Sequence, residues 1–291
     1  RAVLVRIQPA RCGNDARARH TDPSTMSRTP HVPFALGRGN ARRKSMQFDR
    51  ALSRPATYPH PAGRIERIET HLSVVYLAGR YAYKRIKPVR FAFVDLVRAA
   101  RRRRCALAEC TLNRPFAGPL YLGVWPLVAR GRRCAFDAPV RIGGRRQRQQ
   151  AAPGEYVVRM RRFDARGMLS ARSTSLDEGL ADADALADML ARHHLHAPRR
   201  APRGHPGSAE CIAAQCRPLL DTLDVAVTDE AALRAWYEAE LTRIAPQLAD
   251  RHAHGFVRAC HGDLHLDNIV RWRNRILMFD CIEFDDTLRW I

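Results

Sequence analysis

Residues 261–270 read HGDLHLDNIV and residues 276–280 read ILMFD, and these two stretches say most about the fold and chemistry of the chain. Asp263 and Asn268 bracket one tight loop, and Asp280 follows an apolar run that we expect to form a buried strand. Such a strand would deliver the Asp280 carboxylate to the same place as the loop. Phosphoryl transfer of the kinase type needs this set, because a carboxylate orients the attacking hydroxyl while an Asn and an Asp hold Mg²⁺ against the phosphates.

The length and composition fit a protein with an ample core. The chain has 291 residues, 46% of them hydrophobic, which is enough for one large domain or two lobes. No apolar run approaches ~18 residues, so we expect no membrane-spanning helix and no membrane partner. Because the first residues also lack the apolar segment of a signal peptide, we expect a cytoplasmic protein.

The net charge of +21 would ordinarily indicate a nucleic-acid or other anionic partner. Of the 50 basic residues, however, only Lys44, Lys84 and Lys87 are lysines, and the other 47 are arginines. Such a bias, in a chain rich in alanine, is more typical of a GC-rich coding sequence than of a phosphate-binding surface. Nucleic-acid binding is therefore the least favoured of three hypotheses, and it predicts an affinity that falls steeply with salt.

The eight cysteines form no C-x-x-C pair, so we expect reduced and mostly buried thiols rather than a zinc site. The chain also lacks the glycine-rich pattern that ends in Gly-Lys-Ser or Gly-Lys-Thr, which excludes a Walker-type nucleotide site. Any nucleotide must therefore be held by a different arrangement of residues.

A lysine in the N-terminal half is a candidate for contact with phosphates. The pattern predicts strands at 65–70, 72–77 and 81–84, which places Lys84 inside a strand. A compact ammonium can sit between two phosphates in a way that a guanidinium cannot. We favour Lys84 over Lys87, because Lys87 precedes Pro88 and lies where the strand is expected to end.

A helix is predicted at 95–113 from the partial amphipathic spacing of its apolar residues. Glu109 is the only acid between Asp95 and Asp137, and a phosphate-binding lysine needs such a carboxylate as an orienting partner. The further predictions for this half of the chain are strands at 120–128 and 156–160, an exposed loop at 143–154 and a hinge at 159–163.

Beyond the hinge the pattern changes to helices, at 176–194 and 230–253, joined by a Pro- and Gly-rich connector at 199–207. Strands followed by helices predict an α+β protein with two lobes, at 48–161 and 162–291. The composition of residues 1–47 favours disorder. These residues could also be an upstream extension, since Met46 begins the first segment whose pattern predicts a folded structure. An Arg-rich transit peptide is the alternative for residues 1–47.

Taken together, these stretches resemble the aminoglycoside phosphotransferase family, whose members are relatives of protein and choline kinases. The closer resemblance is to a bacterial subgroup of kinase-like proteins that is often fused to a separate P-loop ATPase domain. It extends from about residue 48 to the end of the chain. The matching stretches are residues 69–73, 83–89, 112–114, 121–124, 158–163, 260–270 and 279–284.

The resemblance implies a two-lobed kinase-like fold and a role for each candidate residue. Residues 70–74 would take the place of the glycine-rich loop over the nucleotide phosphates, and His261 would shape the catalytic loop by hydrogen bonding. The implied site consists of Asp263 as catalytic base, Asn268 and Asp280 as Mg²⁺ ligands, and Lys84, Glu109 and Ser73 as ATP-binding residues.

The leading hypothesis is therefore an ATP- and Mg²⁺-dependent enzyme that phosphorylates a hydroxyl of a small molecule. A non-catalytic, kinase-like nucleotide-binding module is the second hypothesis. One departure from the subgroup is Asp267, which stands where a Gly usually precedes the Asn. Glu283, Asp285 and Asp286 are left open between supporting contacts, binding of a cationic acceptor and solvated carboxylates. The chain ends at Ile291, where the subgroup continues into further helices, so we expect the C-terminal lobe to be incomplete and a P-loop ATPase domain to follow.

Overall fold

The computed structural model describes residues 40–91, 93–131, 133–140, 154–172, 175–199, 206–220 and 229–291. The predictions for residues 1–39 and for most of the 143–154 loop and the 199–207 connector lie outside this range. Residues 40–47, for which the composition favours disorder or an upstream extension, begin a helix, α1 (Asn40–Leu52). None of the helices in the described ranges is both long and apolar enough to cross a membrane.

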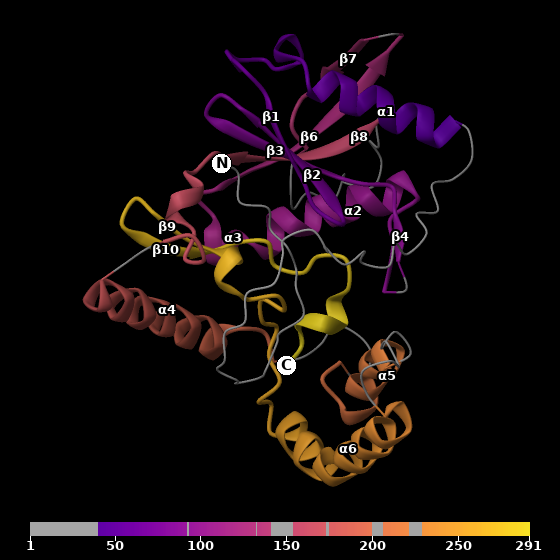
Figure 1. Ribbon diagram of the computed structural model, residues 1–291, viewed down its shortest axis with the longest axis vertical. Helices are drawn as coiled ribbons and strands as arrows, with labels where there is room; N and C mark the ends of the chain where they lie inside the picture. Colours follow the sequence, from indigo (N-terminus) through magenta and orange to yellow (C-terminus); the bar gives the residue numbers. More distant parts are fainter. Residues whose placement is uncertain are drawn as a thin grey trace, which may run out of the picture.

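A curled six-stranded sheet, antiparallel throughout, forms the centre of the fold (Figure 1). Its strands follow the spatial order β1-β2-β3-β8-β6-β7. They are β1 (Glu66–Glu69), β2 (Ser73–Ala78), β3 (Tyr81–Ile86), β6 (Tyr121–Arg130), β7 (Arg133–Phe136) and β8 (Glu155–Arg161). The predicted α+β class is thereby confirmed, and residues 159–161 of the predicted hinge form the end of β8.

Each face of the sheet packs against one helix. On one face, Phe48 and Leu52 of α1 pack against Tyr76 and Tyr83, and on the other face Cys105 and Ala106 of α2 (Ala99–Leu112) pack against strands β3 and β8. Successive side chains of β3 point to opposite faces, since side chains alternate along a strand. Lys84 therefore points toward the α2 face, together with Ala82 and Ile86.

Helix α2 starts four residues later than the sequence pattern predicts. Asp95 belongs to a short hairpin formed by β4 (Arg90–Phe91) and β5 (Val94–Asp95). The Asp95 carboxylate pairs with Arg90 and accepts a hydrogen bond from the N–H of Val97, at 3.0 Å. These contacts hold the chain in a non-helical conformation just before the helix begins.

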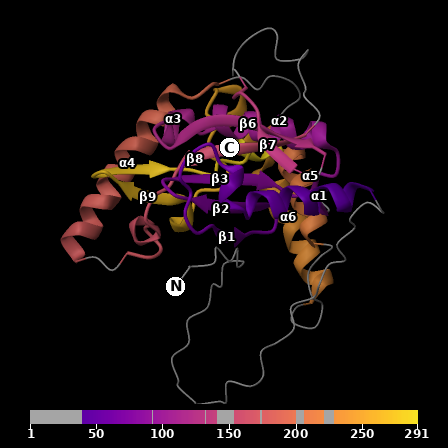
Figure 2. The same ribbon diagram turned by 90° about the horizontal axis from the view of Figure 1, so that it is seen from above.

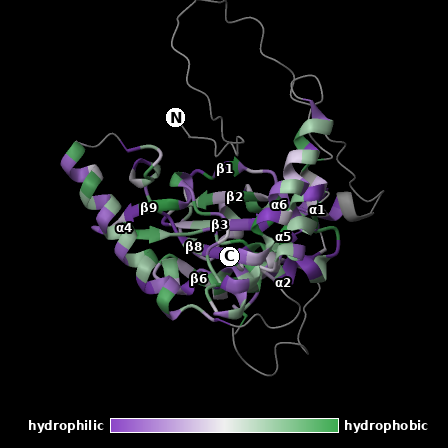
Figure 3. Cartoon of the chain, turned by 90° about the horizontal axis from the view of Figure 1, so that it is seen from below, coloured by the Kyte–Doolittle hydropathy of each residue, from purple (hydrophilic) through white to green (hydrophobic). Residues whose placement is uncertain are grey.

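The remaining part of the chain is largely helical. A two-stranded hairpin, β9 (Ile269–Trp272) and β10 (Arg275–Met278), packs against α3 (Arg114–Ala117) and α4 (Leu176–His196). The apolar side of α4 is formed by Leu186, Met189 and Leu190. Along the helix as a whole, hydrophobic and hydrophilic residues alternate (Figure 3). Asp182 of α4 pairs with Arg271 of β9, which fixes the helix to the hairpin.

Helices α5 (Ala209–Leu220) and α6 (Glu230–Ala253) pair with one another on the side of the molecule away from α4 (Figure 2). Although α6 has 24 residues, none of its described side chains is buried, and Trp236 is 63% exposed. The seven described cysteines are all free, and Cys105, Cys110, Cys260 and Cys281 are buried. Reduced, mostly buried thiols were predicted, and four of these seven cysteines are buried.

Candidate active site

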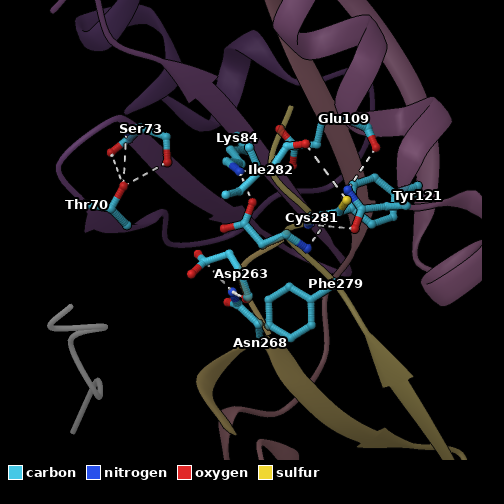
Figure 4. A network of polar contacts seen from close by, with 12 residues as sticks. Thr70, Ser73, Lys84, Glu109, Tyr121, Asp263, Asn268, Phe279, Cys281 and Ile282 are labelled. Carbon is cyan, nitrogen blue, oxygen red and sulfur yellow. Dashed lines mark hydrogen bonds and ion pairs between the residues drawn. The ribbon is translucent and has the colours of Figure 1, made fainter. Parts of the chain in front are cut away.

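Lys84 lies at the centre of a group of charged side chains between the sheet and the C-terminal loop. Its Nζ atom is 3.0 Å from Oε1 of Glu109 on α2 and in closer contact with Oδ1 of Asp280 after β10. The Lys84 side chain is 11% exposed and that of Glu109 is completely buried. Three segments that are distant in sequence therefore meet at one ammonium group, as the prediction for Lys84 and Glu109 requires (Figure 4).

The electrostatics of this group are dominated by burial and by mutual attraction. Burial opposes the charge of Lys84, but attraction to Asp280 and Glu109 outweighs it and holds the lysine pKa well above its usual value. Burial raises the pKa of Glu109 to about 7, and that of the nearby Glu283 to about 8. Glu283, which the sequence left open, thus belongs to the charged group around Lys84.

The backbone places Asp280 at the end of β10 in a left-handed conformation, with φ of 63°. Asp is one of the few residues that adopt this conformation readily. The N–H of Asp280 donates to the Tyr121 hydroxyl at 3.2 Å, and the N–H of Cys281 donates to Oδ1 of Asn113 at 3.0 Å. Asn113 in turn donates to the backbone oxygen of Glu109 at 2.9 Å, so the loop after β10 is tied to the end of α2.

Tyr121 and Asn113 are the supporting residues that sequence reasoning missed. Burial raises the pKa of the Tyr121 hydroxyl well above its usual value, so it stays neutral and able to accept from Asp280. A signal was present, because both residues lie in stretches that carry the family resemblance, 112–114 and 121–124. Their roles depend on contacts across long sequence separations, which no local pattern reveals.

His261 shapes the loop that carries Asp263, as predicted. Its Nε2 atom donates to the carbonyl oxygen of Phe279 at 3.0 Å, which leaves Nδ1 as an acceptor for the N–H of Asp263 at 3.4 Å. Burial lowers the pKa of His261, which favours the neutral ring that this pattern needs. Gly262 has φ of 87°, and a Cβ atom there would lie 3.0 Å from Cγ of Arg289, so the position requires glycine.

Asn268 presents a carbonyl oxygen toward the site. Its Nδ2 atom donates to the backbone oxygen of Asp263 at 2.8 Å, and this acceptor fixes the orientation of the amide. Oδ1 of Asn268 is used in none of the hydrogen bonds found among the described residues. The backbone oxygen of Asn268 accepts from the N–H of Phe279 at 2.9 Å, which ties Asn268 to the residue that precedes Asp280 (Figure 4).

Thr70 and Ser73 close the turn between β1 and β2. The N–H of Ser73 donates to the Thr70 hydroxyl at 3.0 Å, and the N–H of Thr70 donates to the backbone oxygen of Ser73 at 2.9 Å. The two hydroxyls are also 3.0 Å apart. The turn is therefore locked by its own side chains, and both residues face the cavity described next.

A cavity of about 620 Å³ connects these residues, which is a size typical of small-molecule sites. Its apolar walls come from the sheet, with Ile68, Val75 and Ala82, and from Phe279 and Met168 beyond it. Five of the six predicted residues line it, namely Ser73, Lys84, Glu109, Asn268 and Asp280. Asp263 is not part of the wall, but its Oδ2 atom lies 3.4 Å from Nδ2 of Asn268 and its side chain is 46% exposed.

The donor chemistry fits a hard cation such as Mg²⁺, which prefers oxygen ligands. Asn268 offers an amide oxygen, and Asp280 offers a carboxylate that is 42% exposed and holds Lys84 through only one of its two oxygens. Within the described residues, no three His, Cys, Asp or Glu side chains are grouped so as to hold a metal by themselves. A cation here would therefore depend on ligands beyond these side chains, as Mg²⁺ usually does with water and phosphates.

Comparison with known proteins finds relatives but no established function. The chain is 29% identical over 229 residues to uncharacterised proteins of Mycobacterium bovis and of two strains of Mycobacterium tuberculosis. The alignment covers 77% of this chain and 42% of each relative, so the chain spans less than half of their length. No protein-family model and no solved structure matches the chain.

Proposed function

We propose that the protein is a phosphotransferase that uses ATP and Mg²⁺ to phosphorylate a hydroxyl group of a small molecule. The observation that carries this proposal is the position of the Lys84 ammonium between Glu109 and Asp280, which are 25 and 196 positions away in the sequence. Phosphoryl transfer depends mainly on positioning and charge neutralisation, and a buried lysine oriented by a carboxylate supplies both.

The cavity accounts for nucleotide binding in this proposal. Its apolar walls suit a base, and its polar end carries the groups that hold phosphates. Lys84 binds phosphate oxygens while Glu109 keeps its side chain extended, and the turn at Thr70 and Ser73 borders the phosphates. Asn268 and Asp280 are the ligands for Mg²⁺, which when bound neutralises phosphate charge.

Asp263 is the proposed catalytic base. Its carboxylate is exposed enough to meet a second substrate, and the Asn268 amide beside it links it to the metal ligands. In this position it orients the acceptor hydroxyl and takes up its proton. The backbone oxygen of Asp263 is held by Asn268 and its N–H by His261, so the loop presents the carboxylate in a fixed place.

The fold supports a kinase-like assignment within this proposal. An antiparallel sheet carries the lysine on its third strand, the following long helix carries the partner Glu, and a later loop and hairpin carry the base and the metal ligands. This order of parts favours a two-lobed kinase-like protein of the aminoglycoside phosphotransferase family. A P-loop ATPase domain as a partner in a longer protein stays a prediction.

The test measures transfer of the γ-phosphate of ATP, with Mg²⁺, to a broad panel of hydroxylated metabolites. Thermal unfolding with ATP alone, with Mg²⁺ alone and with both is recorded in parallel. We expect the largest stabilisation with both together and phosphorylation of at least one class of acceptor. The absence of both stabilisation and transfer would contradict the proposal.

A non-catalytic nucleotide-binding module is the second candidate. The observation that favours it is that, among the described residues, no three His, Cys, Asp or Glu side chains form a group that could hold a metal by themselves. Stabilisation by ATP with Mg²⁺ but no transfer to any acceptor would select it. Nucleic-acid binding, the third hypothesis, requires an affinity for oligonucleotides that falls steeply with salt, and an affinity independent of salt excludes it.

A further inference from the structure

A series of ion pairs connects the two helices that cover the sheet. Asp49 on α1 pairs with Arg85 on β3 at 2.7 Å, and Arg85 lies 3.6 Å from Glu155, the first residue of β8. Glu155 pairs in turn with Arg102 on α2. We call these four residues, Asp49, Arg85, Glu155 and Arg102, the ion-pair relay. It passes from one face of the sheet to the other around the end of β8.

Arg102 uses its guanidinium group to join α2 to two other segments. Its Nε atom donates to Oε2 of Glu155 at 3.0 Å, and Nη2 is in closer contact with Oε1. Nη1 donates to the backbone oxygens of Leu96 and Val97, at 2.9 and 2.6 Å. One side chain thus fixes the start of α2 both to the strand and to the residues that precede the helix.

Arg102 and Glu109 lie on the same face of α2. They are seven residues apart, which is close to two full turns of an α-helix. Any rotation of α2 about its axis that moves Arg102 therefore moves Glu109 by a similar angle. Since Glu109 reaches Lys84 through a single oxygen, Oε1, a modest rotation separates the two.

Most of the other buried side chains of α2 are small. Apart from Arg102, Leu107 and Glu109, its buried residues are the small side chains of Cys105, Ala106 and Cys110. Small side chains interlock less with neighbouring residues than large ones. The residue before the helix, Arg98, provides no side-chain cap either. Arg102 supplies a fork of directed hydrogen bonds, to Glu155 and to the backbone oxygens of Leu96 and Val97.

The energetics agree with a role in orientation rather than in stability. Arg102, Glu155 and Arg85 are all buried, and buried ion pairs contribute little net stability because desolvation offsets their attraction. Their best-attested contribution is to specify one arrangement among several. In α2 the arrangement at issue is the rotation that brings Glu109 to Lys84.

We propose that Arg102 and Glu155 are positioning residues, which set the rotation of α2 so that Glu109 meets Lys84. Asp49 and Arg85 hold Glu155 from the other face of the sheet. The position of α1 against the sheet is therefore coupled, through Glu155, to the site. The consequence for nucleotide binding rests on the proposed function, but the arrangement of α2 does not.

The test exploits the fact that the chain contains only three lysines, Lys44, Lys84 and Lys87. Acetylation with an N-hydroxysuccinimide ester, followed by mass spectrometry of peptides, gives a separate rate for each lysine. Without nucleotide, Lys84 should react slowest, because it is buried and doubly paired. In Arg102→Met we expect its rate to rise about tenfold, equivalent to about 1.4 kcal/mol of lost preference for the paired arrangement. The rate at Lys44 should stay unchanged.

The matched control is Arg90→Met, which removes an exposed ion pair with Asp95 that is 2.7 Å long. It should leave the rate at Lys84 unchanged. Because Arg102→Met leaves the Glu155 charge buried, the double variant Arg102→Met with Glu155→Leu, which removes both charges, is measured as well, and its folding is checked by denaturant unfolding. A native rate at Lys84 in this folded double variant would overturn the proposal.

A second measurement separates this inference from the proposed function. ATP with Mg²⁺ should slow the acetylation of Lys84 in the unsubstituted protein. If it does not, while Arg102→Met still exposes Lys84, the proposed function fails and the positioning role stands. If ATP protects Lys84 but Arg102→Met leaves its rate unchanged, the positioning role alone is overturned.

Discussion

The two halves of the candidate site differ in their exposure to solvent. In the half formed by the sheet and α2, Lys84 is 11% exposed and Glu109 is completely buried. In the half formed by the C-terminal loop, Asp263 is 46% and Asp280 42% exposed. The charged groups of the closed half must pair with one another, whereas those of the open half can also bind ligands. We therefore expect substitutions in the closed half to reduce stability and those in the open half to reduce activity.

The largest effect on activity is expected in the open half, for Asp263→Ala. Loss of a general base typically slows a reaction by about 10²–10⁴-fold. Thermal unfolding and the stabilisation by ATP with Mg²⁺ should stay as in the unsubstituted protein, because the carboxylate is half exposed and lies outside the cavity wall. An Ala variant with unchanged turnover would contradict the proposed role.

The largest effect on stability is expected in the closed half, for Lys84→Met. It leaves the Glu109 charge buried without its partner, and breaking a buried pair typically costs about 3–5 kcal/mol. Denaturant unfolding measures this loss, and nucleotide binding should disappear as well. The double variant Lys84→Met with Glu109→Leu should recover most of the stability but none of the binding. Recovery of binding in the double variant would show that Lys84 does not contact the nucleotide.

The stability of the site should also depend on pH. Burial raises the pKa of Glu109 to about 7 and that of Glu283 to about 8, so the folded protein binds protons more readily there than the unfolded chain. The contribution of these two groups to the free energy of unfolding is fully present below about pH 4.5, the usual pKa of a Glu side chain. This contribution is lost as the pH rises through 7 and 8. The slope should be at most about 1.4 kcal/mol per pH unit for each group. Unfolding of Glu283→Gln should show a shallower slope over this range, and an unchanged slope would contradict the prediction.

The smallest effect is expected for Lys87→Met, the matched control for Lys84. Lys87 forms a 3.1 Å ion pair with Glu69, whose side chain is 45% exposed, and pairs of this kind contribute less than about 1 kcal/mol. Denaturant unfolding and nucleotide binding should both change little. A loss of binding as large as that in Lys84→Met would show that the two lysines act together.

The sequence predicted the elements that carry the site better than the contacts between them. The apolar run at 276–279 predicted strand β10, the spacing of strands placed Lys84 within β3, and the isolated Glu109 predicted its pairing with that lysine, which the structure confirms. In each of these cases the signal is local, either a periodic pattern or a charged residue in a segment with few others of its kind.

The relay and the supporting hydrogen bonds could not be predicted in this way. Arg102 is one of four consecutive arginines, residues 101–104, and nothing local distinguishes the buried one from its neighbours. Likewise, Tyr121 supports Asp280 across 159 positions of sequence. The overall charge obscures such residues, because in a chain of this composition a structural arginine looks like any other.

The three segments that meet at Lys84 become available at different times during synthesis. Glu109 lies 25 positions after Lys84 and Asp280 lies 196 positions after it. At about 5–20 residues per second, the second carboxylate leaves the ribosome roughly ten to thirty seconds after the first. The sheet and α2 can therefore fold with the Lys84–Glu109 pair already formed, before Asp280 has been made. If the proposed function holds, the nascent protein stays inactive until the proposed metal ligands Asn268 and Asp280 have been made.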